Sequence, residues 1–193
     1  MASCRHSDEH SNPLPRATLR ALVVRAIIAG GKIRSDPADH AWVRSILTPA
    51  EFDLWTRQPA YDQDHAVQVA RRVQRRLALT VYGGDTLWPS AALMHDVGKR
   101  ESDLSMGERV IATLASKVVG VATARRWAST ATNLKRRIGL YLIHGELGAS
   151  MIRAAGGREE IAAWTEVHQG YQDIARLGIP SIVVDALLES DVG

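Results

Sequence analysis

The chain of 193 residues is long enough to bury the hydrophobic core of one ordinary domain. Hydrophobic residues make up 46% of it, which excludes wholesale disorder, and a formal charge of +3 is too small for a dedicated nucleic-acid binder. Cys4 is the only cysteine, so neither a disulfide framework nor a thiolate zinc site is expected. No apolar run is long enough to cross a membrane, and the polar N-terminus does not resemble a secretory signal, so we expect a cytoplasmic protein.

The first part of the chain predicts a disordered tail followed by helices. Residues 1–15 are polar and end in two prolines, which predicts the tail. A helical extension is expected over 16–47, with one helix ending before the glycines at 30 and 31 and another starting after Asp36. Thr48 and Glu51 form a capping box that starts a further helix, and the main domain is expected to run over 48–193.

The central part predicts two helices that carry histidines. Residues 62–79 have apolar side chains at the i, i+3, i+4, i+7 spacing of an amphipathic helix, and the glycines at 83 and 84 end this stretch. A second helix is expected from about Trp88 to Gly98. Ser105 and Glu108 form another capping box.

Helical sequence continues to the C-terminus. After Ser105 it runs to about residue 155, with breaks expected at Gly120 and at 129–133. Further helices are expected over about 158–168 and from Pro180 onward. Strand signals are nearly absent, so the sequence predicts an all-α helical bundle.

Four histidines, on four separate predicted helices, fall on the apolar faces that should be buried: His65, His95, His144 and His168. A single histidine in such a position is usually a packing residue, and we interpret His40 in that way. Four together, with Asp96 beside one of them, favour a metal site, because buried ionisable groups are costly unless they are paired or bind metal. Imidazole and carboxylate without thiolate suit Mn, Fe, Zn, Co or Ni, and Mg less well.

The residues around these histidines resemble the HD-domain superfamily of metal-dependent phosphohydrolases. The string ALMHDVGK (92–99) is similar to the defining His-Asp signature of that family. Segments similar to the family's other motifs occur in the expected order, namely DQDHAVQVARRV (62–73), HGELGASMI (144–152), WTEVHQGY (164–171) and IPSIVVDALLESD (179–191). The resemblance covers about residues 48–191 and implies an HD-like helical bundle.

The resemblance also implies a ligand set for two divalent transition-metal ions, Mn or Fe first, with Zn, Co, Ni or Mg as alternatives. His65, His95, Asp96 and Asp191 would hold the first ion, and His144 and His168 the second, with Asp96 bridging. Two such ions can clamp the attacking and leaving oxygens of a phosphoryl transfer. Lys99 is placed to meet a substrate phosphate as a point charge.

The last predicted helix contains two aspartates, Asp185 and Asp191, that cannot both face one site. They are six residues apart, so they differ by about 120° around the helix. Asp191 continues the apolar row of Val184, Leu187 and Leu188, and it is therefore the expected ligand.

The expected function is hydrolysis of a phosphomonoester or phosphodiester, and the expected partner is a small phosphorylated substrate derived from a nucleotide. The sequence differs from the motifs of the known HD subfamilies, so the resemblance points to the generic bacterial branch. Membership of that branch does not determine the substrate. The alternative is a catalytically silent HD scaffold that binds a nucleotide or a protein, and a nucleic-acid-processing role is a third hypothesis.

The stretch 104–140 is longer than compact HD relatives need between the second and third motifs, so it is predicted to be a helical insertion. It contains Arg125, Arg126, Lys135, Arg136 and Arg137. A solvent-facing or homodimer-forming surface is the favoured interpretation, and a membrane surface or nucleic acid is the less favoured one. Four arginines on the 62–79 helix are expected to face water, namely Arg71, Arg72, Arg75 and Arg76.

Overall fold

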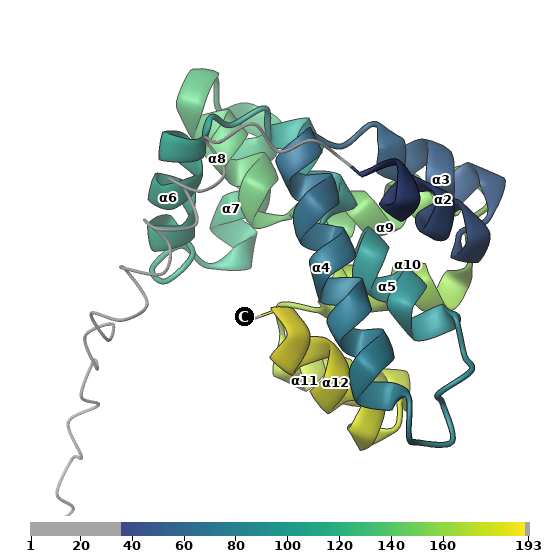
Figure 1. Cartoon of the computed structure of the whole chain (residues 1–193). Coiled ribbons are helices and arrows are strands. Elements are labelled where there is room, and N and C mark those ends of the chain that lie inside the picture. Colours follow the sequence, from purple (N-terminus) through teal and green to yellow (C-terminus); the bar gives the residue numbers. More distant parts are fainter. Residues whose placement is uncertain (1–35, 192–193) are drawn as a thin grey trace, which may run out of the picture.

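The computed structural model describes residues 36–191, and every regular element in that part of the chain is helical, which confirms the predicted all-α class (Figure 1). In chain order the elements are α2 (Pro37–Ile46), α3 (Pro49–Thr56), α4 (Ala60–Leu77), α5 (Leu87–Met94), η1 (Val97–Ser102), α6 (Met106–Ala115), α7 (Val121–Thr130), α8 (Asn133–Leu142), α9 (His144–Ala154), α10 (Glu159–Val167), α11 (Tyr171–Ile174), η2 (Ala175–Leu177) and α12 (Ser181–Asp191). The predicted tail 1–15 and the first predicted helix of the extension lie outside the described residues.

Both predicted capping boxes are present. The hydroxyl of Thr48 accepts a hydrogen bond from the N–H of Glu51, and the Glu51 carboxylate accepts one from the N–H of Thr48, which fixes the start of α3. At the start of α6 the Glu108 carboxylate accepts hydrogen bonds from the N–H and the hydroxyl of Ser105. Capping satisfies backbone groups that a helix end would otherwise leave unpaired.

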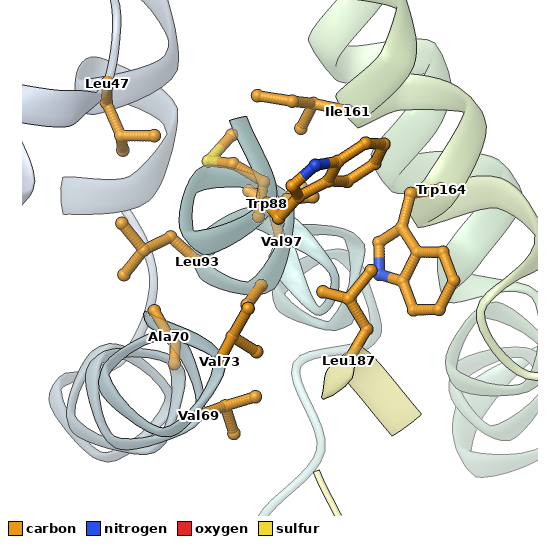
Figure 2. Packing of buried hydrophobic residues seen from close by; sticks show 14 of the residues in the cluster. Leu47, Val69, Ala70, Val73, Trp88, Leu93, Val97, Ile161, Trp164 and Leu187 are labelled. Carbon is orange, nitrogen blue, oxygen red and sulfur yellow. The ribbon is translucent and has the colours of Figure 1, made fainter. Parts of the chain in front are cut away.

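Helix α5 lies in the middle of the main core. Every residue from Trp88 to Met94 is buried, and all of them except Ser90 are apolar. A helix that is surrounded by the core is typically apolar on nearly all sides. Figure 2 shows α5 with Val73 of α4 on one side and Trp164 of α10 on another, and with Leu187 of α12 nearby. The C-terminal end of this central helix therefore delivers the next residue, His95, into the interior.

The predicted insertion forms a separate group of helices, α6 to α8, at one edge of the molecule beside α4 (Figure 1). It has a small core of its own, made by Leu104, Ala112 and Ile138. The expected breaks at Gly120 and at 129–133 are both present, because α7 begins directly after Gly120 and α8 begins at Asn133.

The sequence predicted a helix that continues to Gly98, and this prediction was wrong. Helix α5 ends at Met94, and the chain then turns into the tighter helix η1. This turn places Gly98 against the start of α9, so closely that a Cβ on Gly98 would lie 2.1 Å from the backbone oxygen of His144. The short elements α11 and η2 were not expected either.

Two of the four α4 arginines do not simply face water as expected. The guanidinium of Arg71 lies over the ring of Trp42, 3.5 Å from its centroid. Arg72 donates a hydrogen bond of 3.0 Å to the backbone oxygen of Ser190 in α12. Arg75 and Arg76 are exposed as predicted, although Arg76 is paired with Glu189. The first two arginines therefore join α4 to α2 and to α12.

Candidate metal centre

Three of the four predicted histidines lie just after the end of a helix. His95 and His168 come directly after α5 and α10, and His144, the first residue of α9, is separated from the end of α8 by one residue. The ring Nδ1 of each lies close to the backbone oxygen three residues earlier. The distances are 2.7 Å from His95 to Ala92, 2.6 Å from His144 to Tyr141 and 2.8 Å from His168 to Thr165. Carbonyls in the last turn of a helix lack an intrahelical partner, so the histidine rings supply one.

These hydrogen bonds fix which ring nitrogen carries the proton. A carbonyl can only accept, so Nδ1 must be the donor, and in the neutral ring Nε2 then carries a free lone pair. Histidines that bind metals typically hold their other nitrogen in this way, which sets both the tautomer and the ring orientation. His95, His144 and His168 therefore each present Nε2 as the candidate ligand atom.

The first group of candidate ligands consists of His65, His95 and Asp191. Oδ1 of Asp191 lies 3.1 Å from Nε2 of His65 and 3.5 Å from Nε2 of His95. The three ligand atoms all lie within 4.8 Å of one another. Helices α4, α5 and α12 meet at this point, although the residues are far apart in the sequence.

The second group consists of Asp96, His144 and His168. Oδ1 of Asp96 lies 3.1 Å from Nε2 of His144 and 3.8 Å from Nε2 of His168. The other carboxylate oxygen, Oδ2, lies 3.2 Å from Nε2 of His95 in the first group. The two oxygens of one carboxylate thus face the two groups, which is the geometry that a bridging ligand requires.

Charges and burial at the centre fit cation binding. His95, Asp96 and His144 are each at most 3% exposed, and Nε2 of His95 is buried without a hydrogen bond. Burial, together with the charges of His95 and His144, lowers the pKa of His168 to about 3, so this ring is neutral at physiological pH. Burial raises the pKa of Asp96, but His95 and Lys99 outweigh it and hold that pKa well below its usual range. Imidazole nitrogens and ionised carboxylates of this kind suit a divalent transition metal.

Lys99 lies beside this centre and is hydrogen-bonded to one of its residues. Its Nζ donates a hydrogen bond to Oδ2 of Asp96, and the ring of Tyr141 lies 5.8 Å away. Among the charged side chains here, those of Asp191, His65 and Lys99 are 42%, 20% and 19% exposed, whereas that of Asp96 is 3% exposed. Solvent therefore reaches the centre at these three residues.

A buried ion pair close to the centre was not predicted from the sequence. The guanidinium of Arg109 in α6 donates two hydrogen bonds, of 2.9 and 3.1 Å, to the carboxylate of Asp62 in α4. Asp62 lies one helical turn before His65, so the pair ties the insertion to the helix that carries this histidine. The position of Asp62 on the buried row of α4 was the available signal, whereas nothing in the sequence indicated Arg109.

Comparison of the chain with protein-family models, with curated proteins and with solved structures found no match. The resemblance to HD-domain hydrolases therefore stays a hypothesis. The structure bears on it only through the positions of the residues that the resemblance named. Of the predicted site residues, all six ligands and Lys99 lie at one place in the fold. From residue 36 to residue 191, no helix is long and apolar enough to cross a bilayer.

Proposed function

We propose that this protein is a metal-dependent phosphohydrolase of the HD superfamily that acts on a phosphomonoester or phosphodiester derived from a nucleotide. The observation that carries the proposal is the position of Asp96, whose two carboxylate oxygens face two separate groups of histidines. A lone buried carboxylate would need only one cationic partner, whereas this arrangement matches a carboxylate shared between two ions.

In this proposal His65, His95 and Asp191 hold one ion, His144 and His168 hold the other, and Asp96 contacts both. Mn or Fe is the expected metal. Bound ions of this type polarise a phosphoryl oxygen and lower the pKa of a coordinated water. The protein's own contribution is orientation, because the backbone carbonyls at 92, 141 and 165 hold three of the rings in place. Lys99 supplies a positive charge at the accessible side, which attracts the phosphate group of a substrate.

The test begins with metal. The purified chain is stripped with a chelator, reloaded with Mn or Fe, and assayed by elemental analysis for metal bound per chain. Near two ions per chain is the expected result. The loaded protein is then screened against a panel of phosphomonoesters and phosphodiesters, with Asp96→Asn as the inactive variant and Asp185→Asn as the matched control.

Two results would overturn parts of the proposal. If neither metal binds at micromolar concentrations, the metal centre itself is wrong. If two ions bind but no phosphoester on the panel is hydrolysed, the silent scaffold becomes the better hypothesis, and binding of nucleotides to the loaded protein is then measured directly.

A further inference from the structure

Helix α6 and the turn that follows it carry three exposed apolar side chains. Ile111 and Leu114 lie one turn apart on α6, and Val118 lies in the turn after it; they are 51%, 40% and 85% exposed. The opposite side of the same helix is the one that packs, because Ala112 is fully buried in the small core of the insertion. Figure 1 shows α6 at the outer edge of the molecule.

The apolar exposure is concentrated in the insertion. Among the described residues, five of the eight large hydrophobic side chains that are exposed lie between 111 and 134, and Val121 and Leu134 complete this set. Single exposed hydrophobic residues are normal, but a local concentration of them marks an interaction surface.

The same segment is strongly basic. Residues 104–142 contain seven basic residues and one acidic residue, a net charge of +6, whereas the whole chain carries +3. The acidic residue, Glu108, is already paired with Arg137. Lys117, Arg126 and Arg136 are exposed and have no hydrogen bond or ion pair to the described residues through their side chains. The rest of the chain is negative overall, so the positive charge is concentrated in the same segment as the exposed apolar side chains.

We propose that the insertion docks on an anionic phospholipid bilayer through its exposed apolar and basic side chains, namely Ile111, Leu114, Val118, Lys117, Arg126 and Arg136. Aliphatic side chains beside arginine and lysine suit the boundary between headgroups and acyl chains, where the former are buried and the latter meet lipid phosphates. This inference is independent of the proposed hydrolase activity.

Two other occupants fit the surface less well. A second copy of the chain would bring two segments of net charge +6 together, and such like-charge contact opposes association. Nucleic acid would match the charge, but most of its contacts with proteins go to phosphate and sugar, which suit the exposed valine, leucine and isoleucine side chains poorly. The bilayer is the occupant that satisfies both features at once.

The test measures binding of the full chain to vesicles. Sedimentation with vesicles of phosphatidylcholine alone is compared with vesicles that also contain phosphatidylserine, each at low and high salt. We expect binding only to the anionic vesicles and a marked loss of binding at high salt. Val118→Ser should lower the partition coefficient by roughly three- to tenfold. Arg126→Gln and Arg136→Gln should each lower it by about fivefold.

Matched controls lie elsewhere on the chain. Val81→Ser changes a valine of similar exposure, 92%, and Arg75→Gln removes an exposed arginine that also has no side-chain partner among the described residues. Neither should change vesicle binding. Thermal unfolding checks that each variant is folded.

Three results would overturn the proposal. The first is equal binding to both kinds of vesicle, and the second is binding that Val118→Ser and Val81→Ser reduce equally. The third is absence of binding to the anionic vesicles at low salt. Concentration-dependent dimerisation or binding to a DNA duplex would then assign the exposed residues to one of the other occupants.

Discussion

The carboxylate of Asp191 contacts the imidazole of His65, with Oδ1 3.1 Å from Nε2, although 126 residues separate the two in the chain. The last turn of α12 thereby closes the first ligand group on α4. Asp185, the other aspartate of α12, is exposed to solvent as its place off the apolar row predicted.

We therefore expect Asp191→Ala to weaken the first metal site, whereas Asp185→Ala should leave metal content and turnover unchanged. Changing a residue that merely supports a ligand commonly costs 10–100-fold in metal affinity, so losing a ligand should cost at least that much. Titration of the stripped protein with Mn measures the affinity. Truncation after Leu188 should reproduce the Asp191→Ala result, and a truncated chain that retained its metal would show that Asp191 is not a ligand.

Arg72 is expected to position Asp191. Its guanidinium holds the backbone oxygen of Ser190, next to the ligand, and it places a positive charge at the C-terminal end of α12, where the helix dipole is negative. Arg72→Ala should lower the affinity for the first metal by roughly tenfold, and Arg72→Lys should recover part of it. Arg75→Ala, three residues away on the same helix, is the control and should have no effect. Equal losses for the two alanine variants would indicate a general charge effect instead.

Asp96→Ala should remove both metals, because its two oxygens face the two ligand groups. His144→Ala should reduce the metal content by about one ion per chain, since only the second group includes His144. Elemental analysis of each variant after reloading gives the stoichiometry. If His144→Ala bound as much metal as the unchanged protein, a single-ion site would replace the two-ion centre.

The carboxylate of Glu51 predicts a dependence of stability on pH. It is fully buried, and it accepts hydrogen bonds from the N–H of Thr48 and from the backbone and guanidinium of Arg158. Burial raises the pKa of Glu51, but these bonds outweigh it and hold the pKa below its ordinary value of 4.5. A carboxyl group with a lowered pKa in the folded state stabilises the protein above its ordinary pKa. That contribution is lost as the pH falls below about 4.5.

Glu51→Gln should therefore lower the free energy of unfolding by about 3–5 kcal/mol at pH 7 and by less at pH 3. Urea unfolding of the metal-free protein at both pH values measures the difference. Glu160→Gln serves as the control, because Glu160 is exposed and has no side-chain partner among the described residues. A loss of the same size at both pH values would mean that the charge of Glu51 contributes nothing.

Local signals in the sequence predicted much of this fold. The capping boxes at Thr48 and Ser105 and the apolar row of α4 depend on neighbours within a few residues, and the structure confirms them. The inward direction of the four site histidines could be predicted for the same reason. The metal that they are expected to bind remains a prediction.

Features that depend on distant packing could not be predicted. Arg72 looked like a solvent-facing residue because its partner, Ser190, lies 118 residues away. The pairing of Arg109 with Asp62 joins residues 47 positions apart, and no local pattern indicates it. The turn after His95 follows from the close approach of α9 to Gly98, which helical periodicity alone cannot reveal.

The hydrogen bonds that orient His95, His144 and His168 all end on main-chain oxygens, those of Ala92, Tyr141 and Thr165. Every amino acid carries such an oxygen, so a point mutation at these three positions changes a side chain but cannot delete the acceptor. The side chains at these positions can therefore vary in evolution while the backbone continues to fix the orientation of the same three imidazole rings.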